Sequence, residues 1–274
     1  MIGVFDSGLG GLSVLKELQN KLPDYSYLYL GDSLNAPYGN LGAKTIYKLT
    51  KTALDFMFSK GAVLVLVACN SVSVETVRKL QEDCYNSKHS NKKILGIIIP
   101  TVENISQKCT KNSAIALIGT KQTIHSNKYK FEILKRRKDM VVYPHATPRL
   151  AGLIEKGDEG VVYANIRKEL SYFKKMDYQY FLLACTHYSF YYDFFKKELP
   201  NNIKLFNSSF FVAEKTAEYL KKHSYLPIKK NKSTTIYTTG DLDKFKNRAT
   251  ALLENTNKRE IKYLKTSIFT NNCF

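Results

Sequence analysis

The sequence predicts an α/β protein made of two pseudosymmetric domains, each built on a parallel sheet, with the active site at their interface. Apolar runs of strand length alternate with helical segments along most of the chain, which is typical of parallel sheets. Two of these runs, at residues 64–69 and 181–185, end in the same Ala-Cys pair and then turn polar. Because ligands bind beyond the carboxyl ends of strands in open α/β sheets, this repeat predicts two halves whose strand ends face one shared cleft.

The composition allows a protein of this kind. The 274 residues, 44% of them hydrophobic, suffice for two domains with a substantial core. Five cysteines, an odd number without regular spacing, favour a reducing compartment. The chain does not open on a basic segment followed by a long apolar one, and no stretch approaches the roughly 18 apolar residues of a membrane span. We therefore expect a soluble, cytoplasmic protein with no membrane partner.

The net charge of +18 resembles that of nucleic-acid-binding proteins. Lysine is nevertheless spread along the whole chain, and the densest basic runs, at residues 135–138 and 229–232, are not interleaved with aromatic side chains that could stack on bases. A general bias of the source proteome toward Lys, Asn and Tyr explains the charge at least as well. We expect no nucleic-acid partner, although the charge can steer anionic substrates toward the cleft.

The first elements set the pattern for the rest. A strand at residues 2–5 runs into a glycine-rich turn at 6–11, and the helix after it carries a leucine at every third position from Leu12. The glycines allow close approach of a ligand, and the helix N-terminus offers free N–H groups to an anion. The next expected elements are a strand at 25–30, a polar loop at 31–40, a helix at 44–59 with Gly61 as its C-cap, the strand that ends at Cys69, a helix at 71–84 and a strand at 94–99 that Pro100 stops.

A domain boundary is expected near residue 97, after a polar stretch at 85–93. Beyond it, strands are expected at 114–118, at 140–143, in the run that ends at Cys185, at 203–206 and at 235–237. One helix is expected to start within 120–129, and further helices are expected at 148–156, 160–175, 210–222 and 242–253. The alternation predicts parallel sheets throughout. The sequence does not indicate a role for the polar segment after Asn255.

Cys69 and Cys185 are the candidate reactive groups. A single free cysteine at the end of an apolar run usually packs as a small hydrophobic side chain. Two cysteines in matched settings, each followed by two hydrogen-bonding side chains, favour a functional role. No metal site is expected, because the sequence has no C-x-x-C motif and His187 lacks a second ligand at suitable spacing.

Two cysteines that face one cleft can form a redox pair, act as nucleophile and resolving thiol, or serve as two proton carriers. Redox partners usually lie close in sequence, and only Cys185 has an adjacent histidine to act as a base. The chemistry that uses both thiols is inversion at a carbon, in which one thiolate removes a proton from one face and the opposite thiol returns a proton to the other. We expect the following helix N-termini to lower the pKa of each thiol from about 8.5.

The same motifs supply other polar groups near the thiols. Asp6, Glu155 and His187 are titratable candidates to move protons or to tune the thiols, and Asp6 is also a candidate N-cap. An amino acid substrate is indicated by uncharged donors suited to holding carboxylates, namely Ser7, Asn70, Ser71 and Thr186.

Six motifs are distributed over nearly the whole chain. They are Asp6-Ser7-Gly8-Leu9-Gly10-Gly11, Gly31-Asp32 through Pro37-Tyr38-Gly39, Ala68-Cys69-Asn70-Ser71, Gly119-Thr120 through Thr123 with Ser126 and Tyr129, Ala184-Cys185-Thr186-His187-Tyr188, and Thr239-Gly240-Asp241 with Phe245. Together they resemble those of the glutamate racemases of the aspartate/glutamate racemase superfamily. The resemblance implies a cofactor-independent enzyme that interconverts L- and D-glutamate and supplies D-glutamate for peptidoglycan. It also implies that the final segment returns to the first domain, so that residues 1–96 with 207–274 form one domain and residues 97–206 the other.

By this resemblance, Cys69 and Cys185 are the two catalytic acid/bases, assisted by Asp6, Glu155 and His187. The positions that correspond to substrate contacts are Asp6, Ser7, Tyr38, Gly39, Asn70, Ser71, Thr120, Thr123, Thr186 and His187. The chain departs from the family pattern with Ser71 for Thr, Val72 for Ala, Ser189-Phe190 for Pro-Leu and Asn207 for Asp, and none of these changes removes a catalytic group.

Two other functions stay open. An enzyme of the same scaffold that racemises aspartate or a related amino acid would use the same thiols, although the Asp-Ser-Gly and Pro-Tyr-Gly motifs favour glutamate. A non-catalytic basic binding protein would show no racemisation, and any affinity for DNA would fall steeply with salt. Glutamate is thus the expected small-molecule partner. Whether the chain forms a homodimer is left open by the sequence.

Overall fold

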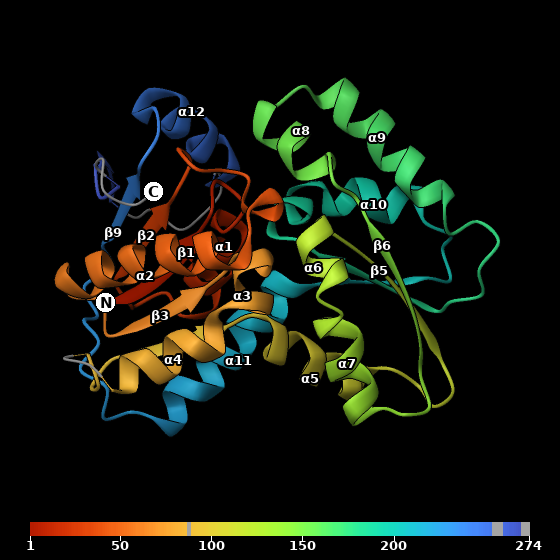
Figure 1. Ribbon diagram of the computed structural model, residues 1–274, viewed down its shortest axis with the longest axis horizontal. Coiled ribbons are helices and arrows are strands. Elements are labelled where there is room, and N and C mark those ends of the chain that lie inside the picture. The colour runs from red at the N-terminus through yellow and green to blue at the C-terminus, as the bar shows by residue number, and fades with distance from the viewer. Residues whose placement is uncertain (87–88, 254–259, 270–274) are drawn as a thin grey trace.

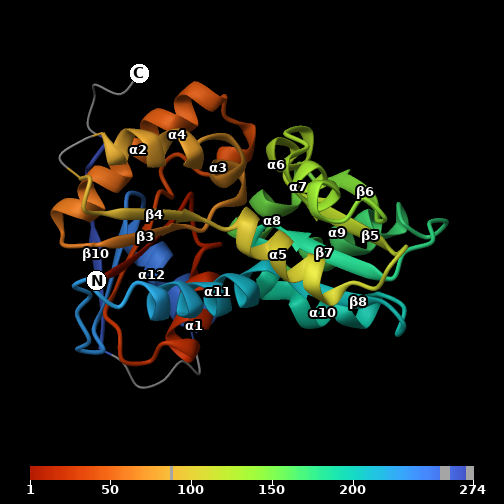
Figure 2. The ribbon, with the colours of Figure 1, turned by 90° about the horizontal axis from the view of Figure 1, so that it is seen from below.

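The computed structural model describes residues 1–86, 89–253 and 260–269. Two parallel sheets form two lobes that lie side by side, with helices packed around each sheet (Figures 1 and 2). Every strand pair in the described part of the chain is parallel. The predicted fold class and the predicted parallel sheets are therefore confirmed.

The first sheet has six strands in the order β10-β9-β2-β1-β3-β4. Its strands are β1 (Ile2–Asp6), β2 (Tyr27–Gly31), β3 (Leu64–Val67), β4 (Lys93–Gly96), β9 (Thr234–Thr238) and β10 (Ile261–Lys265). The helices of this lobe are α1 (Leu12–Lys21), the short 3₁₀ helix η1 (Tyr38–Asn40), α2 (Ala43–Ser59), α3 (Asn70–Glu75), α4 (Val77–Tyr85), α11 (Ser208–Lys222) and α12 (Leu242–Leu253).

The second sheet has four strands in the order β6-β5-β7-β8. They are β5 (Ala114–Gly119), β6 (Val141–Ala146), β7 (Tyr180–Ala184) and β8 (Lys204–Asn207). The helices of this lobe are α5 (Ile98–Lys108), α6 (Lys121–His125), α7 (Lys128–Arg136), α8 (Leu150–Lys156), α9 (Glu159–Ser171), the 3₁₀ helix η2 (Thr186–Tyr191) and α10 (Tyr192–Glu198). The domain limits proposed from the sequence, 1–96 with 207–274 and 97–206, stay a prediction.

Burial on both faces explains why the central strands read as continuous apolar runs. In β1, Val4 packs in the core on the side of α1 and α11, whereas Phe5 packs in the core beneath α2. All five residues of β1 are buried. A strand covered by helices on both faces has no solvent side and therefore no need for alternating polar residues.

The carboxyl ends of both sheets meet at the boundary between the lobes. β1 ends at Asp6, β3 ends two residues before Cys69, and β7 ends directly before Cys185. Helix α3 packs against α6 of the other lobe (Figure 1), and α1 packs against η2. Residues far apart in the chain are thereby brought to one boundary.

The transition between the lobes differs from the sequence prediction. The predicted strand at 94–99 is wrong in its second half, because β4 ends at Gly96 and α5 begins at Ile98. Pro100 does not stop a strand but lies in the first turn of α5. Proline is tolerated there because the backbone N–H groups of a first turn have no partner within the helix.

Other element boundaries also differ. The predicted helix at 71–84 is two helices, α3 and α4, interrupted at Thr76, whose φ of −126° is not helical. Helix α8 starts at Leu150 instead of residue 148, and α9 ends at Ser171 instead of residue 175. Gly61 adopts a left-handed φ of +93° just beyond α2, as expected for a glycine that ends a helix.

The single helix start expected within 120–129 is two helices, α6 and α7, and neither α10 nor β10 is expected from the sequence. Among the described residues, β10 pairs with β9 alone, at one edge of the first sheet, and its sequence carries two lysines among its apolar residues. Charged side chains on an edge strand prevent unwanted pairing, but they also hide the strand pattern. In the described residues, every helix is too short or too polar to cross a membrane.

Candidate active site

The two candidate cysteines occupy equivalent places at the lobe boundary. Cys69 is the N-cap residue of α3 beyond β3, and Cys185 is the N-cap residue of η2 beyond β7. Their side chains are 6% and 4% exposed, and neither forms a disulfide. Each thiol thus lies at a strand end in its own lobe, enclosed by residues of the boundary.

The Cys69 thiol is held in its protonated form. Its sulfur lies 3.4 Å from the Ser7 hydroxyl oxygen. Burial, followed by the negative charge of Asp6, raises the pKa of Cys69 to about 12. The expectation that a helix N-terminus lowers this pKa is wrong for Cys69, because α3 has six residues and its N–H groups offset only part of the desolvation.

The Cys185 thiol faces a buried His–Glu pair. Its sulfur lies 3.8 Å from Nδ1 of His187, whose Nε2 lies 2.6 Å from Oε1 of Glu155. Burial alone would lower the pKa of His187, but its bonds to Cys185 and Glu155 raise that pKa well above its ordinary value. Burial acts to raise the pKa of Glu155, yet the bond to His187 brings it below its usual range. Both shifts favour the charged pair of imidazolium and carboxylate.

Asp6 lies between the two halves of the site. Its Oδ1 accepts the N–H of Gly8 at 3.0 Å, and its Oδ2 accepts the hydroxyl of Thr186 from the other lobe at 3.2 Å. Burial raises the pKa of this carboxyl, although the charge of His187 opposes the shift. The N-cap residue of α1 is Gly11 and no side chain caps that helix, so the alternative role of Asp6 as its N-cap is wrong.

The glycine-rich turn after β1 lets the lobes approach closely. The N–H of Leu9 donates to Oε1 of Glu155 at 2.9 Å. A Cβ on Gly8 would collide with that carboxylate, and a Cβ on Gly10 would collide with the Thr186 hydroxyl and the His187 ring. Only glycine provides this space.

Asn70 presents an unused hydrogen-bond donor. Its side chain is 2% exposed, and its Oδ1 accepts the hydroxyl of Tyr129 from the other lobe at 2.7 Å. Its Nδ2 is buried and has no partner among the described residues. Buried donors are nearly always satisfied, so this amide indicates a place for an acceptor on a ligand.

A short chain of hydroxyls crosses the boundary beside Asn70. Ser71 Oγ lies 2.9 Å from Thr120 Oγ1, which lies 3.0 Å from Thr123 Oγ1. Gly39 lies against Thr120, since a Cβ built on it would be 3.0 Å from the threonine Cβ. These four residues, all predicted substrate contacts, therefore form one cluster.

The Tyr38 side chain belongs to a hydrogen-bonded group around Asp32. It is fully buried, and its hydroxyl donates to Asp32. Asp32 also accepts hydrogen bonds from Asn35 and from Thr239 of the returning segment. Asp32 and Tyr129 were not among the candidate residues, although both lie in the sequence motifs, because a motif does not show which polar residue contacts which.

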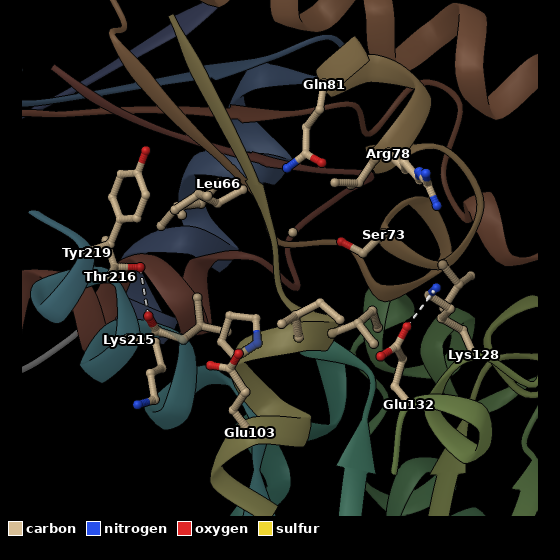
Figure 3. Close-up of a pocket in the computed structure, with 18 of the residues that line it drawn as sticks. Leu66, Ser73, Arg78, Gln81, Glu103, Lys128, Glu132, Lys215, Thr216 and Tyr219 are labelled. Carbon is tan, nitrogen blue, oxygen red and sulfur yellow. Dashed lines mark hydrogen bonds and ion pairs between the residues drawn. The ribbon is translucent and has the colours of Figure 1, made fainter. Parts of the chain in front are cut away.

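Cavities flank the site. One of about 580 Å³ lies where the chain crosses between the lobes, and Figure 3 shows Ser73, Gln81, Glu132 and Thr216 around it. Neither thiol lines it. A second, of about 320 Å³, is lined by Glu155 and His187. No group of three or more potential metal ligands gathers among the described residues.

Comparison with known proteins shows similarity along almost the whole chain. No family model matches. The chain is 33% identical over 263 residues to a glutamate racemase of Roseobacter denitrificans, which covers 92% of this chain and 96% of that protein. Among solved structures, glutamate racemase RacE1 of Bacillus anthracis matches with a TM-score of 0.87 at 28% identity over 97% of both chains. The glutamate racemase of Francisella tularensis in complex with D-glutamate matches with a TM-score of 0.84 at 26% identity over 98% of both chains. With its two-lobed fold and the similarity to these proteins, the chain belongs to the glutamate racemase family, whose members are isomerases.

Proposed function

We propose that this chain interconverts L- and D-glutamate without a cofactor, using Cys69 and Cys185 as the two proton carriers. One thiolate removes the α-proton from one face of glutamate, and the opposite thiol donates a proton to the other face. The observation that carries the proposal is the pair of buried thiols at equivalent strand ends of two lobes, each with its own titratable neighbours.

The two thiols have different titratable neighbours. Cys69, with its pKa of about 12, is protonated at neutral pH and is ready to donate. For the reverse direction it must lose that proton, and Asp6 is a nearby carboxylate able to accept it. The His187–Glu155 pair is placed to pass protons to and from the Cys185 sulfur. Each thiol can therefore act as acid in one direction and as base in the other.

Neutral donors are proposed to hold the carboxylates of glutamate. Asn70 Nδ2 is the donor without a partner, and the hydroxyls of Ser7, Ser71 and Thr186 lie at the same boundary. Thr120 and Thr123 extend this hydroxyl cluster. Donors from both lobes would thus bind one small dicarboxylate between the thiols.

Replacement of Asn70 by alanine is expected to lower kcat/KM by about 30-fold, mainly by raising KM. A hydrogen bond to a charged group contributes roughly 1.5–3 kcal/mol, and each 1.4 kcal/mol is about tenfold. Steady-state kinetics with both enantiomers measures the effect. The matched control is Asn104→Ala, because Asn104 is equally buried but its amide bonds to Pro100 within α5. An unchanged KM for Asn70→Ala would contradict a role in substrate binding.

The reaction itself is tested by incubating the protein with L- or D-glutamate in D₂O. Racemisation is expected from both enantiomers, and the product is expected to carry solvent deuterium at the α-carbon, because the proton removed is not the one returned. Polarimetry and NMR measure the two results. Parallel reactions with aspartate decide between the glutamate and aspartate hypotheses. Inversion without deuterium incorporation would rule out the two-thiol mechanism.

We also propose that the D-glutamate made by this chain in the cytoplasm is used to build peptidoglycan. The support is membership of the glutamate racemase family. Expression of the chain in a bacterium that needs added D-glutamate is expected to restore growth without the supplement. Failure of an active, well-expressed protein to do so would count against this role.

A further inference from the structure

Arg248 connects the returning segment to the lobe that carries Glu155. It lies on α12, which packs against α1 of the first lobe, and Figure 1 shows α12 facing α8 across the boundary. Arg248 is half-buried, and its Nη2 donates to the backbone carbonyl of Ile154 at 2.7 Å. This carbonyl lies in the last turn of α8, where carbonyls have no partner within the helix.

The end of α8 is shaped to receive this guanidinium. Gly157, the residue after the helix, has a left-handed φ of +83°. A Cβ at this position would collide with the guanidinium of Arg248. A positive charge at the C-terminus of a helix is also favourable, because the helix dipole is negative there. Backbone conformation, space and charge therefore all favour an arginine at this place.

The carbonyl that Arg248 binds is next to the catalytic neighbourhood. Ile154 precedes Glu155, whose Oε1 accepts both the His187 ring and the Leu9 N–H. The His187 ring in turn lies 3.8 Å from the Cys185 sulfur. Arg248 and Glu155 also line the same cavity of about 320 Å³. A shift at the end of α8 would therefore move the Glu155 carboxylate relative to His187.

We propose that Arg248 is a positioning residue for the Cys185 half of the reaction. By holding the last turn of α8 across the lobe boundary, it orients Glu155 and, through Glu155, the imidazole of His187. Arg248 itself touches neither thiol. This inference rests on the proposed two-thiol mechanism, because it gives Arg248 its effect through Cys185.

The test combines single and double variants. Arg248→Met keeps most of the side-chain length without the guanidinium, and we expect it to lower kcat/KM about tenfold in both directions. Arg248→Lys, which keeps the charge and can donate to one carbonyl, is expected to recover activity to within about threefold of the original. In a Glu155→Gln background, Arg248→Met is expected to lower kcat/KM less than twofold, because the effects of two substitutions do not add when one residue acts through the other. Lys246→Met, on the exposed side of α12, is the control and should not change the rate.

Thermal unfolding shows whether each variant is folded. For folded variants, three results would overturn the inference: normal activity of Arg248→Met, the same tenfold loss of kcat/KM when Arg248→Met is made in the Glu155→Gln background, or no recovery of activity in Arg248→Lys. Failure of the inference is distinguishable from failure of the proposed function. If the single cysteine variants are inactive while Arg248→Met is normal, only the role of Arg248 is wrong. If either cysteine variant is active, the two-thiol mechanism is wrong whatever Arg248 does.

Discussion

Replacement of Cys69 or of Cys185 by serine is expected to lower racemisation of glutamate by about 10³-fold in both directions. A serine hydroxyl fills nearly the same space but is a far weaker acid than a thiol, so it neither forms the anion that removes the α-proton nor donates as readily. L- and D-glutamate have the same free energy in water, so kcat/KM must be equal in the two directions and must fall equally. Circular dichroism of each enantiomer measures the loss.

The control is Cys109→Ser, because Cys109 is also buried but lies beside the Arg137 side chain, away from the strand ends of the site. This variant is expected to racemise glutamate at close to the original rate. Thermal unfolding of all three variants shows whether they are folded. Near-normal turnover by either Cys69→Ser or Cys185→Ser would mean that one thiol suffices, and the two-base mechanism would be abandoned.

Replacement of Asp6 by asparagine is expected to lower kcat/KM by about 10²-fold at neutral pH. Asparagine keeps the hydrogen bond from Thr186 but cannot take a proton from Cys69. Burial raises the pKa of Asp6, so its carboxylate is lost at a higher pH than that of an ordinary aspartate. Activity of the original protein is therefore expected to fall as the pH drops through this raised pKa, and the variant is expected to lack that part of the profile.

The Asp6→Asn variant also tests whether Asp6 acts only through its negative charge. Its negative charge, after burial, is the main cause of the raised pKa of Cys69, so its removal lowers the pKa of that thiol. If Asp6 acted only through this charge, Asp6→Asn would form the Cys69 thiolate more easily and would be as active as the original or more so. A pH profile of kcat/KM for both proteins distinguishes the two roles. Asp24→Asn, an exposed carboxylate paired with Lys232, is the control for charge alone.

Local patterns in the sequence are sufficient to predict the architecture and the position of Cys69 and Cys185 at strand ends. The runs that end at Cys69 and Cys185 are apolar because each strand is covered on both faces, and this requirement is visible in the residues themselves. The glycines after β1 likewise signal a close approach before the approaching residue is known. The strand expected at 94–99 is longer than β4 because Ile97, Ile98 and Ile99 are apolar and suit either a buried strand or a buried helix face.

By itself, then, the sequence determined that this protein has parallel α/β lobes with one cysteine at a strand end of each. Only the tertiary structure decided which groups meet there: Tyr129 with Asn70, Asp32 with Tyr38, and Arg248 with the end of α8. It also decided that the Cys69 pKa rises, whereas the sequence led us to expect a fall. The physical reason is that the strand pattern depends on neighbours along the chain, whereas hydrogen-bond partners and desolvation depend on which residues folding brings together in space, whether they are six positions apart, as in Asp32 and Tyr38, or 94, as in Arg248 and Ile154.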